Sequence, residues 1–292
     1  MASIKKRVKR RLPLLFIFIV LLVGVGLFMY PKVSNWISVY TAKTEISSYD
    51  KAVKKLDNTD KEKLKKQAQE YNAALAENNH DKLEKFNYDE ILSISNAMAY
   101  VDIPKINVYI PIFHGTEDEE LQQGVGHMKG TSFPIGGKST HSVIAGHTGL
   151  PTAEIFTDID QLVNGDVFYI HVLDEILAYK VDQIKVVLPE ETDDTQIVQG
   201  EDYVTLLTCT PYGINDHRLL VRGTRIPYNK QNEDIVQNKP VESNTSENEL
   251  PLDTIIWFAA VALTLLIVTI IFLILFLPVR KKRGKNKKPH QT

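Results

Sequence analysis

Two uncharged apolar runs constrain the fold of this chain more than any other feature. Residues 13–30 and residues 254–279 contain no charged side chain. The hydrocarbon core of a bilayer is ~30 Å thick and takes roughly 20 helical residues to cross, so both runs are long enough to span it. We therefore predict two transmembrane helices, with the bulk of the chain between them.

Basic residues flank the two runs on their outer sides. Residues 1–12 hold six Lys or Arg side chains and residues 280–292 hold seven, and neither segment holds an acidic one. Basic residues next to a membrane span mark its cytoplasmic side. We therefore predict that both basic tails are cytoplasmic, where they contact membrane lipids, and that the region between the spans lies outside the cell membrane.

Each apolar run has an alternative interpretation. The first run has the position of a secretory signal peptide, but the residues that follow it, GLFMYPKVSNW, are bulky and lack a small-residue cleavage pattern. The second run has the composition of a buried core helix, but its length and its basic flank are typical of a stop-transfer segment. Uncleaved spans remain our prediction for both.

The region between the spans is acidic. The two tails account for 13 of the 34 basic residues, which leaves 21 basic against 36 acidic residues in the remainder. A nucleic-acid-binding surface would be basic, so we expect no nucleic-acid partner. The chain has no CxxC or HExxH spacing, and we expect neither a metal nor a cofactor; a zinc site built from His141 and His147 is the alternative.

The external region divides into a helical part and a strand-rich part. In residues 31–98, apolar side chains recur at spacings of four, three and four, which is one face of a helix; they are Leu64, Ala68, Tyr71 and Leu75. We predict that this segment packs against the domain that follows it, at residues 99–228. Residues 229–253 are polar and poor in aromatic side chains, and we interpret them as a linker.

Short strands with turn signals fill residues 99–228. Residues 167–173 and 176–187 predict one hairpin, and residues 202–209 and 217–226 predict another. Residues 151–162 predict a short helix whose apolar face holds Ile155, Phe156, Ile159 and Leu162. Many short strands of this kind indicate a β-sandwich or a closed barrel.

The chain has one cysteine, Cys209, at the end of an apolar strand. A single cysteine outside the membrane makes no internal disulfide and suggests a reactive thiol, although a small buried hydrophobe is the alternative. In the second hairpin Arg218 would lie about 5 Å from it across the strands. A cation there favours the thiolate and can stabilise an oxyanion, for which the backbone N–H of Thr210 is a second donor.

A thiol nucleophile needs an acid and base, which is most often histidine. His147 ends an apolar strand and lies between Gly146 and Thr148, at the mouth of a loop. It is our first candidate for the acid and base. His114, which follows another apolar run, is the alternative.

At these residues the chain resembles the sortases, the cysteine transpeptidases of Gram-positive cell surfaces. TLLTC at residues 205–209 matches their TLxTC signature, and the resemblance extends over roughly residues 98–228. It is closest to class C, the pilin-polymerising sortases, which have a second membrane helix with a basic tail. The resemblance implies a mostly β fold: a closed, mainly antiparallel β-barrel with short helices, a preceding helical segment and two flanking transmembrane helices.

The resemblance also implies a site and a reaction. Cys209 would be the nucleophile, His147 the general acid and base, and Arg218 the oxyanion and substrate-positioning residue, with Thr208 and Thr210 beside them. The substrate would be an LPxTG-like sorting signal on a pilin subunit, and the acceptor a lysine amine of another pilin. A sortase that attaches proteins to cell-wall precursor is the alternative enzyme, and a non-catalytic surface scaffold is the alternative of another class.

One class C feature is missing from the sequence. Sortases of this class usually have a lid over the cysteine, with an Asp-Pro-aromatic motif, but residues 32–103 contain no proline. Residues 78–92 occupy the corresponding place, and we expect Phe86 or Tyr88 to reach the cleft as lid residues. The alternative is that these aromatic side chains pack on the barrel.

Overall fold

The structure is a computed structural model that describes residues 2–150, 153, 155–229 and 252–276. It forms two compact units, one of Met1–Phe28 with Glu242–Thr292 and one of Met29–Val241. The predicted tail at 280–292 lies outside the described residues, as does the predicted linker at 229–253 except for residues 229, 252 and 253.

The first unit contains apolar helices. Helix α1 (Ala2–Lys55) begins in this unit, and helix α6 (Leu252–Phe276) belongs to it. Among the described residues, one helix, from Phe16 to Lys55, is long and apolar enough to cross a membrane, whereas α6 offers a shorter apolar stretch at Ala259–Ile270. The first predicted span therefore lies in a helix of suitable length and composition, and the second stays a prediction.

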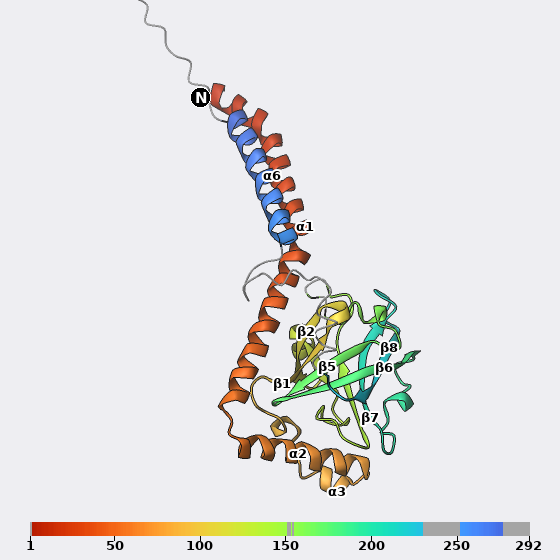
Figure 1. The fold of residues 1–292 in the computed structure, drawn as a ribbon. Helices are drawn as coiled ribbons and strands as arrows, with labels where there is room; N and C mark the ends of the chain where they lie inside the picture. The colour runs from red at the N-terminus through yellow and green to blue at the C-terminus, as the bar shows by residue number, and fades with distance from the viewer. Residues whose placement is uncertain (1, 151–152, 154, 230–251, 277–292) are drawn as a thin grey trace, which may run out of the picture. The chain divides into compact units, whose positions relative to one another are not determined.

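Eight strands of the second unit, within the described part of the chain, close into a barrel in the order β1-β2-β3-β4-β7-β8-β6-β5 (Figure 1). The β2–β3 and β4–β7 pairings are parallel, and the others are antiparallel. The predicted closed barrel is confirmed. The strands are β1 (Ala97–Ile103), β2 (Val108–His114), β3 (Val125–His127), β4 (Thr140–Ala145), β5 (Val167–Val172), β6 (Glu175–Val187), β7 (Asp202–Thr210) and β8 (His217–Ile226).

Both predicted hairpins are present. Strands β5 and β6 pair antiparallel from Val172 opposite Glu175, and β7 and β8 pair antiparallel from Thr210 opposite His217. Short elements join the other strands. They are η2 (Pro104–Ile106), α4 (Asp118–Gln123), η3 (Ile159–Gln161) and η4 (Asp193–Thr195).

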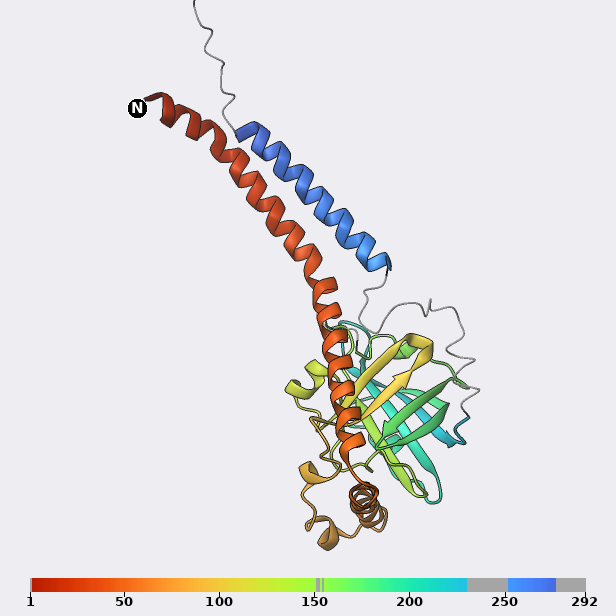
Figure 2. The same ribbon diagram turned by 60° about the vertical axis from the view of Figure 1, so that its left-hand side comes forward.

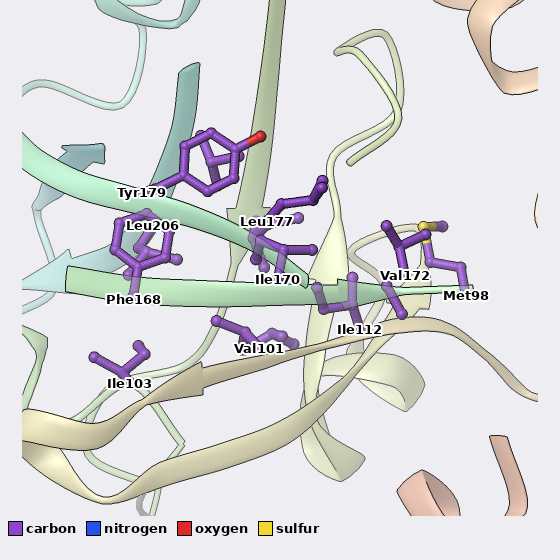
Figure 3. Close-up of a cluster of buried hydrophobic side chains, with 14 of the residues drawn as sticks. Met98, Val101, Ile103, Ile112, Phe168, Ile170, Val172, Leu177, Tyr179 and Leu206 are labelled. Carbon is purple, nitrogen blue, oxygen red and sulfur yellow. The ribbon is translucent and has the colours of Figure 1, made fainter. Parts of the chain in front are cut away.

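The hydrophobic core fills the inside of the barrel. Because side chains alternate along a strand, every second residue of each strand enters it. Figure 3 shows side chains from five strands meeting there, among them Ile103 of β1, Ile112 of β2, Phe168 of β5, Tyr179 of β6 and Leu206 of β7, and all five are buried. Burying each such side chain contributes about 1.5–3 kcal/mol to the free energy of unfolding. The barrel wall is therefore a stable support for the loops at its ends.

The predicted helix at residues 151–162 is wrong. Among the described residues of this stretch only the 3₁₀ turn η3 is helical, and Leu150 makes an isolated β-bridge with Ala153. The N–H of Phe156 donates to the carbonyl of His147, nine residues earlier, instead of to a helical partner. The apolar side chains at the predicted positions are nevertheless buried, because an irregular loop folded onto the core satisfies the same spacing.

The remainder of α1 packs along the outside of the barrel (Figure 2). Ile46, Tyr49 and Val53 of this helix form a cluster with residues of β1 and β2, including Tyr100 and Phe113. The hydroxyl of Tyr49 also accepts a hydrogen bond of 2.7 Å from the backbone N–H of Leu173.

Helices α2 (Asn58–Ala76) and α3 (His80–Leu83) follow, and α2 buries the predicted face. Ala68 and Tyr71 belong to the core cluster, and Leu64 and Leu75 pack against it partly buried. Asn72 makes two hydrogen bonds with the backbone of Phe133. Its side chain donates to the carbonyl of Phe133 at 3.1 Å and accepts from the N–H of Phe133 at 2.7 Å. The predicted helical segment is thus packed on the barrel.

Tyr88, in the turn η1 (Tyr88–Glu90), joins the same segment to strand β3. Its hydroxyl lies 2.9 Å from both Nδ1 and the carbonyl oxygen of His127, and it accepts from the N–H of Gly115 at 3.0 Å. The Nε2 of His127 lies 2.9 Å from the carbonyl of Ser132, which can only accept, so Nε2 holds the proton. Complete burial lowers the pKa of His127 to about 4 and keeps the ring neutral.

We expect Tyr88→Phe to lower the free energy of unfolding by about 1–3 kcal/mol, because the buried Nδ1 and carbonyl oxygen of His127 lose the hydroxyl that lies 2.9 Å from both, and the N–H of Gly115 loses its acceptor. Urea unfolding monitored by circular dichroism measures the change. Tyr212→Phe is the matched control, since Tyr212 is exposed and its hydroxyl should contribute nothing measurable. Equal stabilities of the two variants would contradict the role of this hydroxyl.

Candidate active site

Cys209 and Arg218 are direct neighbours on the β7–β8 hairpin. They are register partners, so their side chains lie on the same face of the sheet. The next pair, Thr208 and Leu219, is buried on the opposite face. Cys209 and Arg218 therefore lie on the outer face of the barrel wall, where Cys209 is half-buried and free of any disulfide. The predicted register of Cys209 opposite Arg218 is confirmed, and the action of the guanidinium on the thiol stays a prediction.

His147 lies on the other side of Cys209. Strand β4 runs parallel to β7 with Ala145 opposite Leu207, and the N–H of Gly146 donates to the carbonyl of Leu207 at 3.0 Å. Ala145 is the last paired residue of β4, and His147 follows it by two residues, as Cys209 follows Leu207. The pairing therefore brings the strand ends that lead to His147 and to Cys209 to the same end of two neighbouring strands.

A buried hydrogen bond ties these two strand ends together. The hydroxyl of Thr208 donates to the carbonyl of Gly146 at 2.7 Å. The residues on either side of this bond are His147, next to Gly146, and Cys209, next to Thr208. The hydroxyl of Thr208 therefore connects the backbones next to His147 and Cys209. Its predicted part in positioning the substrate stays a prediction.

The guanidinium of Arg218 is held by the loop between β7 and β8. Its Nη1 donates to the carbonyls of Asn215 at 3.2 Å and His217 at 3.0 Å. The loop also contains a pair in which Nδ1 of His217 lies 2.8 Å from the carboxylate of Asp216, and this hydrogen bond lowers the pKa of Asp216. His217 is therefore occupied with its neighbour in the chain, consistent with a structural role.

A pocket of 240 Å³ opens beside the thiol. Its lining includes Cys209 and both predicted threonines, and the remaining residues come from the segment between β4 and β5, from the β7–β8 loop and from β8. They are Thr148, Thr157, Asp158, Asp160, Gln161, Tyr212 and Leu219. Thr210 lines the pocket directly after Cys209, and its part in stabilising an oxyanion stays a prediction.

Sequence reasoning missed most of this lining. The missed residues from 157 to 161 stand in the stretch that was predicted as a helix, where polar residues looked like a solvated face, and Thr148 precedes that stretch. Tyr212 gave no signal either, but its ring covers Gly149, where a Cβ atom would lie 2.8 Å from the ring. Gly149 has a φ of +72°, so both the turn and the approach of the ring favour glycine there.

The predicted lid residues lie elsewhere. Neither Phe86 nor Tyr88 lines the pocket at Cys209. The Phe86 ring packs edge-on against Tyr71 at 5.7 Å, and the Tyr88 hydroxyl is bound to His127 and Gly115. The alternative, that these aromatic side chains pack on the barrel, describes the structure, because a buried hydroxyl with these partners is stabilised in the core and not over the cleft.

The alternative histidines are also engaged away from the pocket. Nε2 of His114 lies 2.6 Å from the carbonyl of Ile91, and burial lowers its pKa. The two ring nitrogens of His141 lie 2.9 Å from the carbonyl of Gln196 and 2.7 Å from the hydroxyl of Thr205. In the part of the chain that the structure describes, no group of three or more His, Cys, Asp or Glu side chains is arranged to hold a metal ion.

A closed β-barrel with a free cysteine opposite an arginine at the end of a hairpin fits a class of cysteine transpeptidases, and comparison with known proteins shows that class. Residues 101–226 match the sortase domain family. The chain belongs to the sortase family. Its structural relatives place it in class C.

Two solved structures and one curated protein illustrate the relationship. Sortase C1 of GBS Pilus Island 1 is 45% identical, with a TM-score of 0.61 over 65% of this chain and 94% of that one. Clostridium perfringens sortase C, solved with the C-terminal cell wall sorting motif, is also 45% identical, with a TM-score of 0.57 over 64% of this chain and 100% of that one. Sortase D of Bacillus subtilis is 27% identical over 44% of this chain and 64% of its own length, so this chain spans less than two thirds of that relative.

We expect Thr208→Val to lower kcat/KM for cleavage of a sorting-signal peptide by roughly tenfold, because the strand ends that hold His147 and Cys209 lose their connecting bond. It should also cost about 1–3 kcal/mol of stability, since the carbonyl of Gly146 is left unpaired. Thr208→Ser keeps the hydroxyl and serves as the control. A variant that loses the stability but cleaves within twofold of the parent would show that the bond is structural only.

Proposed function

We propose that this chain is a membrane-anchored cysteine transpeptidase that cleaves LPxTG-like sorting signals and joins pilin subunits to one another. The observation that supports this most is the register of β4, β7 and β8, in which Cys209 is paired with Arg218 and Leu207 is paired with Ala145, two residues before His147. Membership of the sortase family supports the same chemistry.

The first half-reaction forms a thioester. The Cys209 thiolate attacks the carbonyl carbon of the threonine in the sorting signal, and Arg218 and the N–H of Thr210 stabilise the resulting oxyanion. As the tetrahedral intermediate collapses, the C–N bond to glycine breaks and His147 gives its proton to the leaving amine. The pilin is then held on the Sγ of Cys209 and the glycine-containing tail departs.

The second half-reaction transfers the pilin to an amine. A lysine Nζ of the next pilin attacks the thioester carbon, and neutral His147 takes a proton from that nitrogen. The C–S bond breaks, an isopeptide bond remains between the subunits, and the Cys209 thiolate with protonated His147 is restored. The histidine therefore acts once as an acid and once as a base in each cycle.

The lining of the pocket supports an amine as the acceptor. Asp158 and Asp160 lie in the same pocket as Cys209, together with the polar side chains of Thr157 and Gln161. Carboxylates attract the ammonium form of lysine to the mouth of the site. The ammonium loses one proton to solvent to become the attacking amine, and His147 takes the second proton during the attack. The relative from a pilus island fits the pilin interpretation, as does the relative solved with a sorting motif.

The apolar run in α1 supports anchoring in the cell membrane. With a second span at residues 254–279, both basic tails lie in the cytoplasm and the barrel lies outside the cell membrane. Secreted pilins and their sorting signals would meet the enzyme there, which is consistent with an unpaired cysteine kept for catalysis.

We expect the full chain in detergent micelles to gain the mass of the peptide's acyl part when it is incubated with an LPxTG-type peptide. The thioester forms at Cys209, so Cys209→Ala should show no adduct by intact-protein mass spectrometry. His147→Ala and Arg218→Ala should slow adduct formation by about 10²-fold or more, as expected for loss of a general acid or an oxyanion donor. Peptide cleavage that persists in Cys209→Ala would contradict the mechanism, and an absence of adduct with several sorting motifs would favour the scaffold.

We expect the double variant Asp158→Asn, Asp160→Asn to raise KM for a lysine acceptor peptide roughly three- to tenfold, because the ammonium loses its counter-charges. Transfer to hydroxylamine, which is neutral at pH 7.5, should change by less than twofold, as should hydrolysis of the thioester. Both products are measured by liquid chromatography. Asp81→Asn is the control, since Asp81 is exposed in α3. Equal loss with lysine and hydroxylamine would contradict an electrostatic role for the two carboxylates.

A further inference from the structure

One face of α1 presents aromatic and basic side chains to solvent. Lys32, Trp36, Tyr40 and Lys43 recur at spacings of four, four and three, which places them on one side of the helix. We call these four residues the aromatic–basic stripe. The side chains of Trp36 and Tyr40 are 42% and 57% exposed, and their rings lie 6.2 Å apart.

The barrel lies against a different side of the same helix. Ala42, Ile46, Tyr49 and Val53 are buried, and the last three pack on β1 and β2. At 100° per residue, this buried side is centred more than 90° around the helix from the stripe. The packing of the barrel therefore accounts for the buried side of α1 and leaves the exposed rings of the stripe without an internal function.

The charge of this part of the chain suits an anionic surface. The first acidic residue of the whole sequence is Glu45, so the stripe and everything before it hold only basic charges. The remainder of the external region is acidic. A cationic, aromatic face on an otherwise acidic body is the combination that binds anionic phosphates while the body stays in solution.

The position in the chain points to lipid as the source of those phosphates. Trp36 follows the end of the predicted span by six residues, or ~9 Å along a helix, which is close to the headgroup layer where Trp and Tyr gather. Pro31 stands at the end of the span and lacks the N–H for a helical bond, so the helix can bend there. A bend toward the stripe brings Tyr40 and Lys43 to the same layer.

We propose that the aromatic–basic stripe lies in the headgroup layer of an anionic bilayer, with its two rings at the interface and its two lysines on lipid phosphates. This proposal rests on the proposed anchoring of α1 in the membrane. It adds a second membrane contact beyond the span, which selects the side of α1 that faces the lipid. The barrel, on a different side of the helix, is then held in a defined orientation above the surface.

The two tryptophans of the chain make this testable in the full-length protein. Trp257→Phe leaves Trp36 as the single reporter, and adding Trp36→Phe with Tyr40→Trp moves the reporter to position 40. A third chain with Trp36→Phe, Trp257→Phe and Val186→Trp places it on β6, at a side chain that is 59% exposed. Each chain is reconstituted in nanodiscs that contain phosphatidylglycerol, with or without lipids brominated near the headgroup.

We expect brominated lipids to reduce the emission of the reporters at 36 and 40 about twofold or more, and that of the reporter at 186 by less than a tenth, as interfacial burial requires. Lys32→Gln with Lys43→Gln should weaken quenching at position 40 in phosphatidylglycerol discs but not in phosphatidylcholine discs. Lys54→Gln with Lys55→Gln, at the end of α1, is the matched control and should leave it unchanged.

The possible outcomes distinguish a failure of the stripe proposal from a failure of the membrane anchoring on which that proposal rests. A chain that does not remain in the nanodisc fraction would overturn both. A chain that inserts, but whose reporter at 40 is quenched no more than the reporter at 186, would overturn the stripe alone. A reporter at 40 that is unquenched with one copy or two copies in a disc, but is shielded only when two copies are present, would assign the face to a second copy and would also overturn contact with lipid.

Discussion

The parallel pairing of β4 with β7 is the constraint on which the candidate active site depends. It brings the ends of two strands, more than 60 residues apart in the chain, to the same edge of the barrel. The bonds from Gly146 to Leu207 and from Thr208 to Gly146 then set the level at which each strand ends. One strand continues into His147 and the other ends in the pair Cys209–Thr210. A slip of one residue in this pairing would turn one of the two side chains to the opposite face of the wall.

The core and the N-terminal segment of the second unit hold this arrangement in place. The core inside the barrel makes the wall rigid, and the N-terminal segment closes over part of it through the apolar side of α1, the face of α2 and the hydroxyl of Tyr88. The buried side chains of Asn72 and His127 have hydrogen-bond partners for both of their polar atoms. These bonds therefore specify one position of the N-terminal segment on the barrel. In this position the segment packs on the barrel and leaves the pocket at Cys209 to the loops after β4 and β7.

Much of the fold could be predicted because its signals are local. Alternating apolar residues predicted the β5–β6 and β7–β8 hairpins, and the second of these already placed Arg218 beside Cys209. The periodic face of residues 64–75 predicted a helix and the side of it that is buried. The stretch at 151–162 was different: its apolar residues are buried as expected, but helical spacing alone does not distinguish a helix from a loop whose side chains all meet the core.

By itself, the sequence determined the apolar run of α1, the strand periodicity of the barrel and the three residue types of the site, because these depend on composition and on neighbours along the chain. Only the tertiary structure decided that β4 runs parallel to β7, that Asp158, Asp160 and Tyr212 share a pocket with Cys209, and that Tyr88 lies in the core with Phe86 packed against it. Those outcomes depend on contacts between distant segments. Their energies come from packing and from buried hydrogen bonds that exist only once the barrel has closed.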